Sequence, residues 1–167
     1  VESGLSFLAD KLGKKVANSN VNIIDDALME NGYGSSSFDD EGRDSRKNIL
    51  IEKGILKTYY HNTSSAKKYN AEPTGNAGLI SPSSFNLELV KGKKNREELI
   101  KNINNGILIT NIWYTRFNNH ITGDFSTIPR DGMFLIKKGE IVKSLKNLRI
   151  TDNMLRILEN INEIGNN

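Results

Sequence analysis

The sequence lacks cysteine and has few histidines, few prolines and no long apolar run. None of its 167 residues is cysteine, which excludes disulfide bonds and thiolate metal ligands within them. No run approaches the ~18 apolar residues of a membrane-spanning helix. The chain begins at Val1 and shows no secretory leader. These features predict a cytoplasmic protein without a membrane partner, and a fragment of a longer chain.

Charge of one sign is also scarce. The chain carries 23 Lys and Arg against 20 Asp and Glu, a net charge of +3. The basic residues are spread among acidic ones and form no dense stripe, which argues against a nucleic-acid partner. The length and a hydrophobic fraction of 37% are sufficient for one domain, over residues 1–167, with its own core.

Strand-like stretches outnumber helical ones. β-prone runs occupy residues 21–26, 85–90 and 107–117, and the last is expected to be a central strand. Two similar hairpins are expected at 47–61 and 133–145. Each has a Lys-Gly pair at its turn, where glycine permits the positive φ that a tight hairpin needs.

Helical patterns are fewer. Residues 5–17 are expected to form an amphipathic helix and residues 63–70 a short one. Asn95 and Glu98 form a capping-box-like start of a helix that is expected to end at Gly106. A last helix is expected within 151–166. The apolar positions on these helices are Leu5, Leu8, Leu12, Val16, Leu99, Ile100, Ile103, Leu155, Leu158 and Ile161. The predicted fold is α+β, with a mainly antiparallel sheet, sandwich or open-barrel-like, and several flanking helices.

The stretch NHITGDFS, residues 119–126, holds the residue types of a hydrolytic triad in His120, Asp124 and Ser126. A triad needs its nucleophile and base at hydrogen-bond distance, which neighbours in one turn rarely achieve. Thr-Gly-Asp is instead good turn chemistry. We therefore interpret this stretch as a turn and expect no catalytic residue.

Metal and ligand motifs are weak. The two histidines, His61 and His120, lie in different segments, so a zinc site made only from these residues is not expected. The acidic run at 39–41 lacks calcium-loop spacing and fits an ordinary turn.

TGNAG, residues 74–78, lacks the Lys-Ser/Thr pair of a phosphate loop, and its glycines suit the close approach of another backbone, such as that of a peptide. NIWYTRF, residues 111–117, mixes aromatics with Arg116 as nucleic-acid platforms do, but a buried strand explains it more simply.

Several stretches together resemble the C-terminal domain of the TldD/PmbA family. They are LADKLGKKVA, FDDEG, TGN, NGILITNIWY, TGDFS and IGN, in that order, and the resemblance runs from about Leu5 to Asn167. It implies a cytoplasmic proteolytic assembly of two paralogous subunits that processes peptides or unfolded proteins. In the TldD subunit an HExxxH helix and a later cysteine hold zinc, whereas the PmbA subunit, also called TldE, has no metal site.

This sequence has neither HExxxH nor the cysteine, and its TGDFS segment looks like the PmbA type. The resemblance thus implies a non-catalytic, substrate-binding half that pairs with a TldD-like paralogue or with itself, with zinc only in the paralogue or upstream. We expect Thr74, Gly75, Asn76, Thr122, Gly123 and Asp124 to line a peptide-binding cleft. Two alternatives remain: part of an active zinc protease whose HExxxH helix lies outside this chain, and a regulatory module that binds DNA gyrase.

Overall fold

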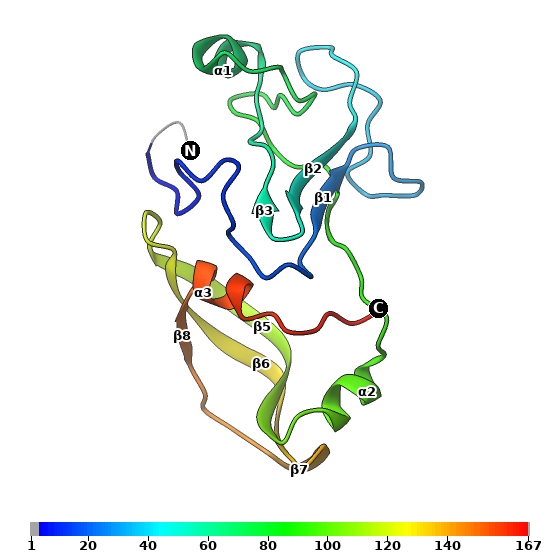
Figure 1. The fold of residues 1–167 in the computed structure, drawn as a ribbon, viewed down its shortest axis with the longest axis vertical. Helices are drawn as coiled ribbons and strands as arrows, with labels where there is room; N and C mark the ends of the chain where they lie inside the picture. Colours follow the sequence, from blue (N-terminus) through cyan, green and yellow to red (C-terminus); the bar gives the residue numbers. More distant parts are fainter. Residues whose placement is uncertain (1–3, 167) are drawn as a thin grey trace. The chain divides into compact units, whose positions relative to one another are not determined.

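A computed structural model describes residues 4–166 of the chain, which divides into two compact units. Unit 1 comprises Val1–Gly4 and Leu8–Val90, and unit 2 comprises Leu5–Phe7 and Lys91–Asn167. Each unit is built around its own antiparallel sheet (Figure 1).

The sheet of unit 1 has the strand order β3-β2-β1-β4. Its elements are β1 (Ile23–Asp26), β2 (Lys47–Glu52), β3 (Ile55–Leu56), α1 (Thr63–Tyr69) and β4 (Leu87–Leu89). The β2–β3 hairpin turns at Lys53 and Gly54, whose φ angles are +48° and +78°. The left-handed backbone predicted for Gly54 is therefore confirmed. Asn62 caps α1 through a capping box with Ser65, and Asn70 ends it in the left-handed conformation.

Residues 5–17 do not form the amphipathic helix expected from their spacing, and this prediction is wrong. Asp10 and Gly13 have φ angles of +56° and +75°, which interrupt any helix. The segment instead bonds beside β3: Gly13 N donates to Leu56 O (2.8 Å), and Leu56 N donates to Lys14 O (3.0 Å). Tertiary backbone hydrogen bonds thus override the helical period.

The sheet of unit 2 has the order β5-β6-β7, with β8 also paired to β6. Its elements are α2 (Arg96–Lys101), β5 (Asn105–Asn119), β6 (Asp124–Lys137), β7 (Glu140–Ser144), β8 (Ile150–Asn153) and α3 (Met154–Glu159). The β6–β7 hairpin turns at Lys138 and Gly139, with φ angles of +51° and +79°, as predicted. The Asn95–Glu98 capping box is also confirmed.

Two helix ends and one strand position differ from expectation. α2 ends at Lys101 and not at Gly106, because Ile103 O and Asn104 O accept from Gly139 N and Lys138 N. α3 stops before Ile161, because residues 165 and 166 bond to residues 92 and 94 in extended form. β5 pairs only with β6 in the described chain, so it is an edge strand and not the central strand predicted.

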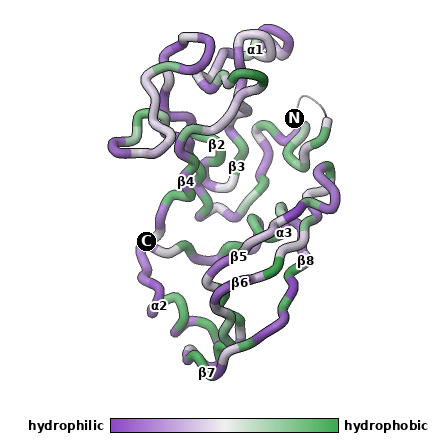
Figure 2. The backbone as a smooth tube through the Cα atoms, turned by 180° about the vertical axis from the view of Figure 1, so that it is seen from behind, coloured by the Kyte–Doolittle hydropathy of each residue, from purple (hydrophilic) through white to green (hydrophobic). Residues whose placement is uncertain are grey.

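The α+β fold with mainly antiparallel sheets is confirmed: residues 4–166 hold two four-stranded antiparallel sheets and three helices of at most seven residues. None of those helices is long and apolar enough to cross a membrane. Hydrophobic residues form one continuous run at 107–109 of β5 and another at 133–136 of β6, and the two runs lie opposite each other in the sheet (Figure 2).

Candidate functional site

The first half of the predicted cleft, Thr74 to Asn76, lies in a buried polar network of unit 1. Asn76 is 0% exposed: its Nδ2 donates to Asp25 Oδ2 (2.8 Å) and Ser83 O (3.1 Å), and its Oδ1 accepts from Asn48 Nδ2 (2.8 Å). Asp25 is equally buried and its Oδ1 accepts from Phe85 N (2.9 Å). Asn76 therefore ties β1 and β2 to the segment that leads into β4. Sequence reasoning missed Asp25 and Asn48, although an aspartate directly after an apolar strand run was a usable signal.

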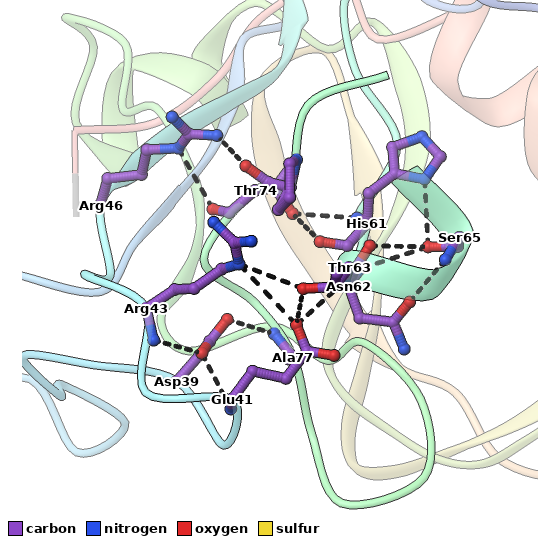
Figure 3. A network of polar contacts seen from close by, with 11 residues as sticks. Asp39, Glu41, Arg43, Arg46, His61, Asn62, Thr63, Ser65, Thr74 and Ala77 are labelled. Atoms are coloured by element: carbon purple, nitrogen blue, oxygen red, sulfur yellow. Dashed lines mark hydrogen bonds and ion pairs between the residues drawn. The ribbon is translucent and has the colours of Figure 1, made fainter. Parts of the chain in front are cut away.

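Hydrogen bonds join Thr74 to His61 (Figure 3). Thr74 N donates to His61 O, and His61 N donates to Thr74 Oγ1, each at 2.9 Å. Gly75 has a φ of +67°, and a Cβ there would lie 2.5 Å from Asp44 O. The close backbone approach that this glycine permits is therefore made by the chain itself.

Tyr60 brings a buried hydroxyl to the same network. Its Oη has no hydrogen-bond partner of ordinary geometry among the described residues. Burial, and then the negative charge of Asp25, raise the pKa of Tyr60 well above its ordinary value near 10. The side chain is thus held neutral.

A shallow hollow of about 460 Å³ opens on unit 1 beside Thr74. Arg46 lies along one side, and its guanidinium donates from Nε to Thr74 O (3.3 Å) and from a terminal nitrogen to Pro73 O. Lys47 pairs with Asp26 at 3.2 Å. The lining residues are Leu12, Arg46, Lys47, Asn48, Ile49, Thr58, Tyr59, His61, Ala71, Glu72 and Thr74. The hollow offers cations and backbone groups but no nucleophile paired with a base.

The acidic run at 39–41 stabilises a loop. Asp39 is buried; its Oδ1 accepts from the backbone nitrogens of Glu41 and Arg43, and its Oδ2 accepts from Ala77 N, each at 3.0 Å (Figure 3). Glu41 Oε2 accepts from Thr63 N at 2.9 Å, at the start of α1. The carboxylates of Asp39 and Glu41 thus accept from the chain's own backbone amides, as the turn interpretation implies.

The second half of the predicted cleft, Thr122 to Asp124, forms the β5–β6 turn of unit 2. Gly123 has a φ of +84° and lies so close to Phe7 that a Cβ would be 3.0 Å from its ring. Asp124 accepts from Thr122 Oγ1 (2.6 Å) and Asn153 Nδ2 (2.9 Å), which lower its pKa. Asn153 also caps α3, so the turn and that helix are fixed together.

The three triad-like residues do not come together. The His120 ring packs on Phe117, with centroids 5.1 Å apart, and Ser126 Oγ lies 3.5 Å from Asn118 Oδ1. Within the described chain His120 forms no hydrogen bond to Asp124 or Ser126. The interpretation of this stretch as a turn is confirmed.

The side chains present do not fit a zinc ion. The two histidines belong to different units, and His61 Nδ1 lies 3.2 Å from Ser65 Oγ. In residues 4–166 no three His, Asp or Glu side chains converge as a metal site would require. With no cysteine in the sequence, the three or four donors that zinc takes are not assembled here.

An exposed aromatic cluster on β5, which we define as Trp113, Tyr114 and Arg130, replaces the buried strand expected at 111–117. Trp113 is 54% exposed and Tyr114 58%. Tyr114 has a φ of +49°, within a bulge between Trp113 and Arg116. The Arg130 guanidinium of β6 lies 6.0 Å and 5.5 Å from the two ring centroids. The mix of aromatic residues and arginine was visible in the sequence. The exposure of these side chains could not be read from it.

A family model for the PmbA/TldA metallopeptidase C-terminal domain matches residues 1–167. The chain belongs to this family. The structural neighbours agree with the match. The fold superposes with a TM-score of 0.92 on a crystal structure of a candidate modulator of a DNA gyrase from Thermotoga maritima, at 36% identity, covering 99% of this chain and 38% of that one.

Relatives carry the names of both subunits. A TldD metalloprotease homologue from Buchnera aphidicola is 34% identical over 168 residues, covering 97% of this chain and 34% of the relative. TldE from Thermococcus kodakarensis superposes with a TM-score of 0.83 at 27% identity, covering 98% of this chain and 40% of that one. The chain therefore spans about a third of the length of the curated relative.

Proposed function

We propose that the chain is a non-catalytic, substrate-binding domain of a TldD/PmbA-type peptidase assembly that processes peptides or unfolded proteins. The observation that supports this most is the position of β5 at the end of its sheet, where its backbone is open to an added strand. An extended peptide that joins such an edge binds through main-chain hydrogen bonds, which tolerate many sequences. That tolerance suits a processor of unfolded polypeptides.

The pairing pattern identifies the open groups of β5. Lys138 N donates to Asn104 O (2.7 Å), and the register continues with Gly106 opposite Ile136 and Leu108 opposite Phe134. Because antiparallel partners alternate, residues 106 and 108 bond toward β6, whereas residues 105, 107 and 109 direct their backbone groups away from it. This length of β5 can receive a peptide strand.

β4 provides a second open edge, in unit 1. Asp26 N donates to Asn86 O and Val90 N donates to Asn22 O, so Leu87 and Leu89 direct their backbone groups away from β1. The network around Asn76 fixes the segment entering β4. On this proposal Thr74, Gly75 and Asn76 act by positioning an edge, and Thr122, Gly123 and Asp124 act by fixing the turn that ends β5.

The absence of catalysis is inferred from donor chemistry. Residues 4–166 do not assemble a zinc site, and the TGDFS segment resembles the PmbA type. Identity does not separate the subunits, because relatives named TldD and TldE both match nearly the whole chain. We propose a TldD-like paralogue, or a second copy, as the cytoplasmic partner, with zinc held by the paralogue or by an upstream segment.

Backbone recognition can be tested with N-methylated peptides. A labelled extended peptide of about ten residues, long enough to cover one strand, is titrated by fluorescence anisotropy. Methylation of alternate peptide nitrogens is expected to abolish binding when they face the protein, and to have little effect in the opposite parity. Equal effects of both parities, or no binding of the unmodified peptide, would contradict strand addition.

A further inference from the structure

We propose that the β5 edge selects acidic extended peptides: Arg116 and Arg130 bind the peptide's carboxylates, while Trp113 and Tyr114 cover its apolar side chains. This inference rests on the proposed function, since it adds a substrate class to the strand-binding edge. It is carried by the exposed cluster, by unpaired guanidinium groups and by the uneven distribution of charge along the chain.

The aromatic cluster is preorganised. The Trp113 and Tyr114 rings meet edge to face, with centroids 6.3 Å apart at 76°. In a regular strand neighbouring side chains point to opposite faces, but the left-handed backbone of Tyr114 breaks that alternation. Strained, exposed aromatics that are already held in place lose little freedom on binding. Trp, Tyr and Arg are also the residue types that dominate binding hot spots.

Among residues 4–166, Arg116 of β5 and Arg130 of the cluster have no carboxylate partner. The neighbouring acid, Asp131, accepts a hydrogen bond from Asn111 Nδ2 (2.7 Å). Guanidinium groups bind carboxylates through paired, charge-assisted hydrogen bonds, which makes a peptide Glu or Asp their natural ligand.

Charge is divided unevenly between the units. Residues 91–167 contain 13 Lys and Arg against 8 Asp and Glu, whereas residues 1–90 contain 10 against 12. The net charge of +3 therefore conceals a basic unit 2 that attracts acidic ligands to its surface.

An extended peptide fits this surface better than a nucleic acid does. The open backbone groups of residues 105, 107 and 109 lie on β5, the strand that also carries Trp113 and Tyr114. A nucleic acid has no peptide backbone that could pair with this row of amide and carbonyl groups. Ile107 and Ile112 are exposed along this strand and offer apolar contacts to alternate side chains of a bound peptide. Single-stranded DNA remains the competitor to be tested, because bases also stack on exposed rings.

The test uses the chain's single tryptophan as its reporter. Three tryptophan-free peptides share one apolar pattern and carry Glu, Gln or Lys at the intervening positions. Trp113 fluorescence is followed at low and high salt. The Glu peptide is expected to bind most tightly, with an advantage that salt reduces. Arg130→Gln and Arg116→Gln should each weaken it by about 2- to 5-fold, the range for an exposed ion pair, without affecting the Gln peptide.

Controls separate charge from structure. Arg96→Gln removes the same charge from α2, where the arginine is exposed, and should leave all affinities unchanged. Arg130→Lys should keep most of the salt-dependent advantage. Trp113→Phe, measured with labelled peptides, shows whether the fluorescence change comes from Trp113.

If the Gln and Glu peptides bind equally, acid selection is wrong and the proposed function stands. If no peptide binds, the proposed function fails first. Tighter binding of an oligothymidine than of the Glu peptide overturns the choice of ligand.

Discussion

Buried polar residues connect the segments of unit 1 beside its small apolar core. Asn76 bonds at once to Asp25, Asn48 and the backbone of Ser83, and the contacts with Asp25 and Asn48 are buried. A buried amide that loses one partner leaves another polar group unsatisfied, which costs about 1–3 kcal/mol. The side chain therefore specifies one geometry for the segment that precedes β4.

Tyr60 should make the stability of unit 1 sensitive to alkaline pH. Its folded pKa is raised above the unfolded value near 10, by burial first and by Asp25 second. The folded state thus binds its proton more tightly, and this contribution is fully present below pH ~10 and is lost as the pH rises further. Tyr60→Phe is expected to remove that part of the decline, measured by urea unfolding between pH 8 and 11.

A matched variant serves as a control for this prediction, because lysines also lose their charge as the pH rises from 8 to 11. Tyr33 is fully exposed, so Tyr33→Phe should follow the wild type. An alkaline decline that is identical in Tyr60→Phe and the wild type would show that the buried hydroxyl does not titrate as described.

At the scale of elements, the two hairpins have the same turn conformation but pack against different segments. Gly54 and Gly139 have almost equal φ angles, +78° and +79°. A Cβ on Gly54 would lie 2.3 Å from Ala17 O, and one on Gly139 would lie 2.7 Å from Lys101 O. Each turn therefore needs glycine twice, for its backbone conformation and for the segment packed against it.

Gly54→Ala should destabilise unit 1 more than a positive φ alone explains. Gly42 is the internal standard, because its φ is +73° and no atom lies within 4 Å of an added Cβ. Gly42→Ala is expected to cost about 1–2 kcal/mol, the penalty of a left-handed L-residue, and Gly54→Ala clearly more. Denaturant unfolding measures both. If the two variants lose the same free energy of unfolding, the Ala17 segment moves aside without a free-energy cost.

Predictions of individual elements succeeded where neighbouring residues determine the structure. They failed where contacts with distant segments determine it. The Lys-Gly turns and the Asn95–Glu98 capping box act within a few residues, so the sequence is sufficient for them. The 5–17 pattern has helical spacing, yet its backbone bonds to β3. β5 has the composition of a central strand, yet within the described part of the chain only β6 pairs with it. Pairing of distant strands is not encoded in any short window.

For the whole molecule, the family relationship covers residues 1–167. Zinc binding needs donors brought together by folding, and the described residues bring together no such set. The role of this chain is therefore proposed from its open strand edges.

Zinc should not bind this chain stoichiometrically. After equilibration with zinc and desalting, elemental analysis is expected to find far less than one ion per chain, and zinc should not raise the unfolding temperature. The His61→Ala, His120→Ala double variant should give the same result. One tightly held ion per wild-type chain, lost in the double variant, would instead favour an active zinc protease.

The sequence by itself determined the turns, the helix caps, the α+β character and the family, because these depend on residue types at short, fixed spacings. Tertiary structure decided which polar residues are buried, that His120, Asp124 and Ser126 stay apart, and that Trp113 and Tyr114 face solvent. Burial and edge position depend on contacts between residues far apart in the chain, and no local pattern records them.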